Sequence, residues 1–378
     1  MTKPTLLILS FSPIAADARV LKQVELFRED YDVTTCGYGP APAGVVEHLA
    51  LPDDVAIWRY PRPLVVLRQY RRAYWGNAAV RAAQGLLRDR VFDVVLANDV
   101  DSVGLALSLS PTRGVHADLH EYAPRMHEED WKFRWFLKPF IEWMCRRFVR
   151  RASSWTTVSG GLAKEYRRVF GITADVVTNA APYRDVTPSK VHDPIRLVHS
   201  GAALRARNLG ALVDGVLAAR AETTLDLYLT PNDTSLLDEL RARAAASGGR
   251  VRLNDPVPYA QLNETLRAYD VGVHLLPPVN FNNRWALPNK LFDYVQARLG
   301  VIVGPSPEME GTVRSHDLGV VTAAFDGASL AAAIDTLRPE DVARWKASAA
   351  RSARDLSSEA QVVIWKRAVD ALAGRGGA

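Results

Sequence analysis

The 378-residue chain contains only two cysteines, Cys36 and Cys145, and no C-x-x-C motif. So few cysteines exclude a disulfide framework and the common zinc sites. No stretch reaches the roughly 18 consecutive apolar residues that a membrane-spanning helix requires. Residues 1–3 lead directly into a strand-like run instead of a signal peptide. We therefore expect a cytoplasmic protein.

The sequence also lacks internal repeats and the G-x-G-x-x-G motif. Without that motif, a dinucleotide-binding Rossmann site is disfavoured. The formal net charge of +5 suits anionic ligands but does not distinguish among them. No recognised nucleic-acid-binding motif is present, so we do not expect a nucleic acid partner.

Hydrophobic residues make up 48% of the chain, which is enough for about two domains with their own cores. Strand-like and helix-like segments alternate in both halves. This alternation predicts two doubly wound, Rossmann-like α/β domains with ligands bound in the cleft between them. We place the domains at residues 1–185 and 195–356 and a C-terminal helix at 357–378, which we expect to cross back to the first domain. The proline-containing segment 184–194 is the predicted linker.

The most informative segment is residues 285–304, WALPNKLFDYVQARLGVIVG. Asn289 suits the start of a helix, Gly300 suits its end, and the apolar run that follows suits a buried strand. A helix that begins after a strand and a loop offers its first N–H groups to an anion. Lys290 and Asp293 lie three residues apart on this helix, so their charges suit a diphosphate joined to a ribose. A surface ion pair explains this spacing equally well.

This segment resembles the nucleotide-sugar region of glycosyltransferase family 4, whose members often read P-x-K-hydrophobic-Phe-Glu-Tyr there. Asp293 stands where the family has the second Glu of its Glu–x7–Glu pair, the residue that binds the ribose hydroxyls. The first Glu, which faces the donor sugar, falls at Trp285 and is missing. The resemblance therefore implies that Asn289, Lys290 and Asp293 bind the donor.

A second match to the family follows the next predicted strand, where the family reads Gly-Arg/x-Leu-x-x-x-Lys/Arg-Gly. Gly201 and Arg207 fit this pattern, whereas Ala202 replaces its first Arg. A glycine lets the backbone approach a phosphate, and a nearby cation neutralises it. We expect Gly201 and Arg207 to bind the donor, with Arg205 or Lys290 compensating for the missing cation.

The predicted strand 114–119 is followed by polar residues in the run DLHEY. This run resembles the family's Asp-x-His-Glu, at the strand end that faces the ligand crevice. The resemblance implies that His120 contacts the donor sugar or handles the acceptor proton, with Asp118 and Glu121 orienting it. Two alternatives remain. His120 is a structural residue, or it shares one strand face with His116 and Asp118 as a metal site. Because the family needs no bound metal, we expect none.

The first loop and helix carry one more candidate. Asp17-Ala18-Arg19-Val20 resembles an Asp-x-Arg-Val found in some family members, where the loop lines the cleft. Arg19 is therefore a candidate cleft residue. The simpler interpretation, which the sequence favours, is a solvated position on a helix.

Residues 131–155 combine aromatic and basic side chains, with Glu142 the one acidic residue within the predominantly basic run that begins at Trp131. Such a composition suits the interface of an anionic membrane. The competing interpretation is that many of these rings pack in the core. The same face gains further residues of both kinds if an earlier segment joins it: Arg62, Arg68, Arg71, Arg72, Tyr60, Tyr70, Tyr74 and Trp75.

Taken over nearly the whole chain, the resemblance implies a GT-B glycosyltransferase of family 4. Such an enzyme moves a sugar, typically a hexose, from a nucleoside diphosphate sugar to the hydroxyl of a glycan, lipid-linked or small-molecule acceptor. It retains the anomeric configuration and needs no metal. Because Trp285 and Ala202 depart from the family pattern, the main alternative is a degenerate protein that binds a nucleotide sugar without transferring it. An epimerase or a phosphorylase on the same fold is a further alternative.

Overall fold

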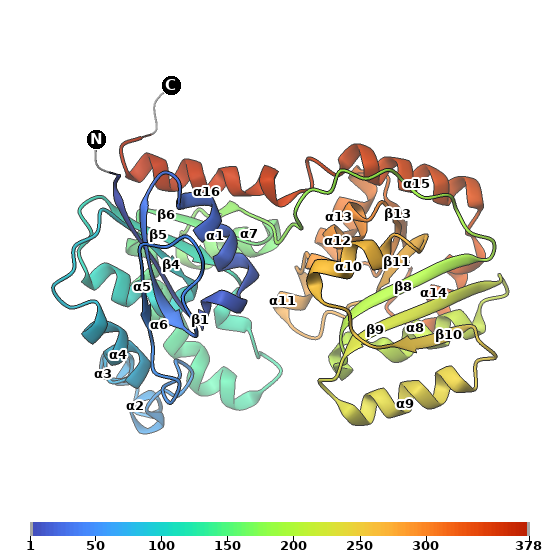
Figure 1. The fold of residues 1–378 in the computed structure, drawn as a ribbon. Coiled ribbons are helices and arrows are strands. Elements are labelled where there is room, and N and C mark those ends of the chain that lie inside the picture. The colour runs from blue at the N-terminus through green and yellow to red at the C-terminus, as the bar shows by residue number, and fades with distance from the viewer. Residues whose placement is uncertain (1–2, 376–378) are drawn as a thin grey trace. The chain divides into compact units, whose positions relative to one another are not determined.

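The computed structural model describes residues 3–375, which divide into two compact units. Unit 1 contains the described residues up to Thr178, together with residues 280–282 and those from Val362 onward. Unit 2 contains residues 179–279 and 283–361. Each unit is built around its own sheet, with helices packed around it (Figure 1).

The sheet of unit 1 has seven strands in the order β3-β2-β1-β4-β5-β6-β7, all parallel. The strands are β1 (Thr5–Pro13), β2 (Asp32–Tyr38), β3 (Glu47–Ala50), β4 (Val94–Asn98), β5 (Gly114–Leu119), β6 (Ser154–Thr157) and β7 (Asp175–Val176). The helices are α1 (Ala18–Phe27), α2 (Arg62–Val66), α3 (Tyr70–Trp75), α4 (Ala78–Leu86), α5 (Asp99–Ser108), α6 (Lys138–Arg147), α7 (Gly160–Phe170) and most of α16 (Ser358–Leu372).

Continuous apolar runs form the centre of this sheet. Residues 6–9 of β1 and 94–97 of β4 are fully buried, as expected for parallel strands that are covered by helices on both faces. The strand order changes direction between β1 and β4. Ligands of doubly wound sheets bind at the carboxyl ends of the strands near such a point.

The sheet of unit 2 has six strands in the order β10-β9-β8-β11-β12-β13, again all parallel. The strands are β8 (Ile195–Ala202), β9 (Thr223–Thr230), β10 (Val251–Asn254), β11 (Val271–His274), β12 (Gly300–Val303) and β13 (Gly319–Val321). The helices of this half of the chain are α8 (Leu209–Ala218), α9 (Thr234–Ala245), α10 (Tyr259–Leu266), α11 (Phe281–Arg284), α12 (Asn289–Gln296), α13 (Pro307–Ser315), α14 (Gly327–Asp335) and α15 (Pro339–Ser352). The direction changes between β8 and β11.

Helix α12 packs closely on this sheet. The ring of Tyr294 lies so near Gly272 of β11 that a Cβ added to the glycine would fall 2.3 Å from it. The helix starts at Asn289, as expected, but it does not end at Gly300. The chain leaves the helix after Gln296, and Arg298 adopts the left-handed conformation with φ 62°. Gly300 is already the first residue of β12.

Arg298 occupies this conformation because its side chain replaces the missing helical bonds. The buried guanidinium donates to the carbonyl oxygens of Val295 and Gln296, at 3.1 and 3.0 Å. It also donates to the carbonyls of Arg184 and Val186. The segment that the sequence predicts as a linker is therefore tied to α12.

A second anchor holds the same segment to unit 2. The ammonium of Lys346 on α15 is buried and donates to Asp270 and to the Ser189 hydroxyl, at 3.0 and 2.9 Å. Asp270 also accepts from the backbone N–H groups of His192 and Arg196. Residues 184–194 are thus packed against the rest of unit 2 and are not a free linker.

The basic and aromatic stretch of residues 131–155 is divided between core and surface. Phe133, Phe140 and Phe148 are buried, as the core interpretation predicts. Trp131 and Trp135 are exposed, the latter 69%. Within the described residues, no helix is long and apolar enough to span a membrane.

Candidate active site

His120 lies directly after β5, at the carboxyl edge of the unit 1 sheet, and is 19% exposed. Its Nε2 is 3.0 Å from Asn98 Oδ1 and 3.3 Å from Asp118 Oδ2, and its Nδ1 is 3.3 Å from Asp99 Oδ2. Burial alone lowers the pKa of the imidazole, but the carboxylates of Asp99 and Asp118 outweigh it and raise the pKa. Oxygen acceptors at both nitrogens favour the protonated ring, which donates hydrogen bonds and has no nitrogen lone pair left to act as a general base.

Asp118 contacts the His120 ring and is itself fully buried. The Arg19 guanidinium donates to its two oxygens at 2.8 and 2.7 Å, and Gln23 and Thr156 add bonds of 2.8 and 2.7 Å. Burial raises the pKa of Asp118, but the charge of Arg19 prevails and holds the pKa well below its usual range. Asp118 is therefore a fixed anion that orients its neighbours.

The expectation that Arg19 is a solvated helix residue is wrong. Its side chain is 7% exposed, and besides Asp118 it donates to the carbonyl oxygen of Val177 at 2.9 Å. The guanidinium also lies over the Trp365 ring, 4.6 Å from its centroid. Arg19 serves the site by fixing Asp118.

Two partners of His120 were not chosen from the sequence. Asn98 is the cross-strand neighbour of Asp118 in the sheet, and Asp99 opens α5 with a φ of 64°, a conformation that residues other than glycine seldom adopt. The signal for both was their place after an apolar strand, at the edge where ligands bind. Glu121, predicted to orient His120, is exposed, and its backbone carbonyl accepts a bond from Tyr166.

His116 does not support the alternative of a metal site. Its two ring nitrogens lie 2.8 Å from the Ser154 hydroxyl and 2.9 Å from the Thr156 hydroxyl. Burial lowers the pKa of His116 to about 4, so it is neutral. Among residues 3–375, no three His, Cys, Asp or Glu side chains are grouped so that they could hold a metal ion.

Unit 2 contains a cavity of about 380 Å³ at the carboxyl edge of its sheet. Three of the predicted donor-binding residues on α12, Asn289, Lys290 and Asp293, line it together with Gly201 of β8. The remaining lining residues are Ser200, Tyr228, Thr230, Pro256, Val257, Tyr259 and Leu262. The site predicted from two separate segments is thus brought together in one unit.

Lys290 and Gly201 fit each other closely. Gly201 has a φ of 148°, and a Cβ added to it would fall 2.5 Å from Lys290 Nζ. Only glycine therefore leaves the ammonium beside the β8 backbone. Burial, followed by the charge of Arg207, lowers the pKa of Lys290 to about 8, and the charge of Asp293 opposes this shift. A cation held in this way favours an incoming anion.

A pair of histidines that the sequence did not single out lies behind this cation. His199 and His274 are buried, and their rings stack with centroids 5.6 Å apart. The Nδ1 of His199 donates to the Val273 carbonyl at 2.8 Å. Burial, and then the charge of Lys290, lowers the pKa of His199 to about 3 and that of His274 well below its usual value. Both rings are therefore neutral and add no charge to the site.

The two arginines near Gly201 differ. Arg207 acts on Lys290 and on both histidines through its charge. Arg205 instead turns to the surface, where it pairs with Glu239 at 2.7 Å and Asp233 at 3.3 Å. Of the two residues expected to compensate for the cation missing at Ala202, Lys290 lines the cavity and Arg205 does not.

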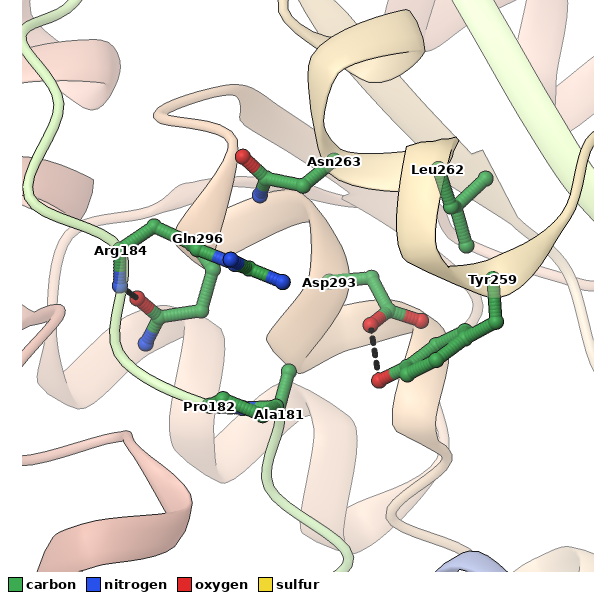
Figure 2. A pocket seen from close by; sticks show the side chains of 8 residues that line it. All are labelled: Ala181, Pro182, Arg184, Tyr259, Leu262, Asn263, Asp293 and Gln296. Carbon is green, nitrogen blue, oxygen red and sulfur yellow. Dashed lines mark hydrogen bonds between the residues drawn. The ribbon is translucent and has the colours of Figure 1, made fainter.

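Asp293 is 9% exposed and also borders a second, smaller cavity of about 20 Å³ (Figure 2). The Tyr259 hydroxyl, which reaches it from α10, lies 3.3 Å from Asp293 Oδ1. On the other side of this cavity, Gln296 accepts a bond from the Arg184 backbone N–H at 3.1 Å. The carboxylate thus stands at the boundary of two cavities.

Two parallel Rossmann-like sheets with polar sites at their carboxyl edges define the GT-B fold, and solved structures share it. HepE from Anabaena, in complex with UDP, matches with a TM-score of 0.68 and 14% identity over 98% of this chain and 100% of that one. Sucrose-phosphate synthase from Thermosynechococcus elongatus matches with a TM-score of 0.71 and 13% identity, over 98% and 100%. Trehalose-6-phosphate synthase from Burkholderia multivorans matches with a TM-score of 0.67 and 10% identity, over 100% of both chains.

Residues 24–181 match the sequence model of Glycosyltransferase Family 4. The predicted fold class is confirmed, and the resemblance to that family is confirmed over these residues. No sequence among the curated proteins matches the chain.

Proposed function

We propose that this protein is a glycosyltransferase that moves a hexosyl group from a nucleoside diphosphate sugar to an acceptor hydroxyl, with retention of the anomeric configuration. The observation that carries the proposal is the cavity of unit 2, where Gly201, Lys290 and Asp293 line one surface. A backbone approach, a cation and a carboxylate are the groups that a diphosphate and a ribose require. Because HepE is known in complex with UDP and with UDP-glucose, UDP is the first nucleotide to test.

In this proposal, the bond between the sugar and the diphosphate breaks while the acceptor oxygen bonds to the same carbon. Negative charge develops on the leaving oxygen, where Lys290 stabilises it. The acceptor proton passes to the leaving diphosphate, since His120 already faces oxygen acceptors at both nitrogens. His120 is then proposed to contact the donor sugar without acting as a base. No metal takes part, because Lys290 and Arg207 supply the positive charge.

We expect a nucleoside diphosphate to raise the melting temperature of the protein. A ligand at one hundred times its Kd adds about 2.7 kcal/mol to the free energy of unfolding. Differential scanning fluorimetry with UDP, GDP, ADP, CDP and dTDP should therefore single out one base, with or without EDTA. Asp293→Ala should abolish the shift, whereas Arg205→Ala, which changes an exposed ion pair, should keep it. If none of the five nucleotides stabilises the protein, the donor site is misassigned.

The competing function is a protein that binds a nucleotide sugar without transferring it, and Trp285 and Ala202 favour it. Both functions predict nucleotide binding. Only the transferase releases free nucleoside diphosphate faster when an acceptor is added, and NMR of its product would show the anomeric configuration of the donor. A protein that binds UDP-sugar tightly but never accelerates this release with any glycan, lipid-linked or small-molecule hydroxyl acceptor is the binding protein.

We further propose that unit 1 contacts an anionic membrane. Exposed apolar side chains lie on or directly after α2 and on the π-helical segment Phe133–Leu137, which contact each other: Val66, Leu67, Trp135 and Leu137. Beside them, Arg68, Arg71 and Arg72 border a groove of about 550 Å³ with Tyr70 and Trp143. Apolar groups that enter the headgroup region and cations that meet anionic lipid are the two components of interfacial binding.

The protein should sediment with vesicles that contain about one third anionic phospholipid and not with purely zwitterionic ones, because each cation near the surface adds about 1 kcal/mol. Replacing Arg68, Arg71 and Arg72 with glutamine should lower the bound fraction at least tenfold. Arg220, which lies on unit 2 and is highly exposed, supplies the control Arg220→Gln. Equal binding to both kinds of vesicle would contradict this part of the proposal.

A further inference from the structure

Tyr259 is placed unlike an ordinary core or surface tyrosine. It is the first residue of α10, and its side chain is 55% exposed, so its ring does little for the core. Its hydroxyl nevertheless reaches Asp293 on α12, with 3.3 Å between Oη and Oδ1. Figure 2 shows the ring extending from α10 toward the carboxylate. An exposed side chain held in one direction by a buried acid suggests a role toward a ligand.

The pair borders both cavities of this region. Tyr259 and Asp293 line the larger cavity with Gly201 and Lys290, and they also line the smaller one. A nucleotide whose phosphates lie at Lys290 therefore meets the phenol and the carboxylate within the same space. The two groups come from different helices, so their spacing depends on how α10 and α12 pack.

The chemistry of the pair is that of two adjacent acceptors. Burial, followed by the charge of Asp293, raises the pKa of Tyr259, so the phenol stays protonated and donates to the carboxylate. Its oxygen keeps lone pairs that can accept a bond, and a carboxylate has about four acceptor positions on its two oxygens. Two neighbouring acceptors match two vicinal hydroxyl groups, which a ribose has and a 2′-deoxyribose lacks.

Because an aspartate side chain is short, Asp293 needs a partner to contact both hydroxyl groups of a ribose. A glutamate at this position would reach one methylene further than Asp293 and could meet both hydroxyls by itself. The aspartate reaches less far, and the Tyr259 hydroxyl lies 3.3 Å from its Oδ1 as a second oxygen beside it. We propose that Tyr259 and Asp293 together form the diol-recognition element of the donor site, and that Tyr259 sets its selectivity for ribonucleotides over 2′-deoxyribonucleotides. This inference rests on the proposed donor site.

The test compares UDP, GDP and ADP with their 2′-deoxy counterparts by isothermal titration calorimetry. For the base that binds, the wild-type protein should prefer the ribonucleotide about tenfold, which is the worth of one good hydrogen bond. Tyr259→Phe keeps the ring and should bring the two Kd values within about twofold. Tyr228→Phe is the matched control, because that phenol lines the same cavity but its hydroxyl bonds Tyr269. It should leave the preference unchanged.

A rescue variant separates recognition from a loss of local structure. In the double variant Tyr259→Phe and Asp293→Glu, the longer acid should restore a preference of at least fivefold, about half of the wild-type value. If a ribonucleotide binds and Tyr259→Phe keeps the wild-type preference, the inference is wrong and the donor site stands. If dTDP, which is a 2′-deoxyribonucleotide, is the nucleotide that binds, the inference is likewise wrong. If none of the five nucleoside diphosphates binds the wild-type protein, the donor site falls, and the inference falls with it.

Discussion

Replacing Lys290 with methionine is expected to lower kcat/KM for sugar transfer by about 10²–10³-fold, the usual effect of removing one group that stabilises developing charge. Methionine keeps the length of the side chain beside Gly201, so the packing there should persist. The measurement is the rate of nucleoside diphosphate release with an acceptor present. Arg205→Met removes a cation from the segment between β8 and α8, but one that pairs with Glu239 at the surface, and it should stay within twofold of wild type.

The same lysine predicts how donor binding depends on pH. Because its pKa is lowered to about 8 and a diphosphate favours the charged form, binding above pH 8 must take up a proton. The Kd should therefore rise about tenfold for each pH unit above 8. Lys290→Arg stays charged and should remove this dependence. For the unliganded protein the sign is reversed. The folded pKa lies below the ordinary 10.5, so the charged form opposes folding below pH 8, and this penalty disappears as the pH rises from 8 to 10.5.

The pH profile also gives the result that would contradict this role. If Lys290→Met binds and turns over the donor like the wild-type protein, the diphosphate does not meet Lys290. If wild-type binding is independent of pH between 7 and 10 while transfer is normal, the ammonium is not the group that neutralises the leaving diphosphate.

Arg19→Met should reduce the free energy of unfolding by about 3–5 kcal/mol, because it leaves the buried carboxylate of Asp118 without its cation. Arg168→Met is the matched control, since Arg168 makes the same two-bonded pair with Glu165 on the surface of unit 1. That variant should lose no more than about 1 kcal/mol. Urea denaturation followed by tryptophan fluorescence measures both. Transfer activity of Arg19→Met should fall with the loss of stability, because His120 loses its fixed partner.

The free energy of unfolding at acidic pH distinguishes loss of the Arg19–Asp118 ion pair from simple loss of packing. The folded pKa of Asp118 is held below its ordinary 3.8, so the pair stabilises the protein above that value, and the gain is lost as the pH falls through the folded pKa. The difference between wild type and Arg19→Met should therefore shrink below about pH 4. The double variant Arg19→Met and Asp118→Asn should recover most of the loss at pH 7. A difference that is constant from pH 3 to pH 7 would mean that the charge is not responsible.

Local pattern was sufficient for most of the elements around the cavity that the predicted donor residues line. The start of α12 and the strand after it follow from an asparagine and an apolar run. The end of the helix did not follow, since a buried arginine took the left-handed position that a glycine usually occupies. The family resemblance assigned Gly201 and Lys290 to the same site. In the structure the two residues are so close that a Cβ added to Gly201 would clash with Lys290.

Contacts between residues that lie far apart in the sequence could not be predicted from it. Arg19 meets Asp118 across 99 positions, and no local rule distinguishes this arginine from a solvated one. Tyr259 reaches Asp293 across 34 positions, through the packing of two helices whose contact no periodicity encodes. Arg205 and Arg207 are equally basic in the sequence, but an acidic face on α9 draws only the first of them away.

The segment of residues 184–194 contains prolines, as flexible linkers often do, and a change in the length of such a linker usually costs little free energy of folding. Here Arg298 and Lys346 hold its two halves through buried hydrogen bonds. An extra residue between Ser189 and Arg196 would break either the bond from Lys346 to the Ser189 hydroxyl or the bond from the Arg196 N–H to Asp270, and so leave the buried Lys346–Asp270 pair one hydrogen bond short. Among relatives of this chain, we therefore expect insertions to collect in other surface loops and this segment to keep its length.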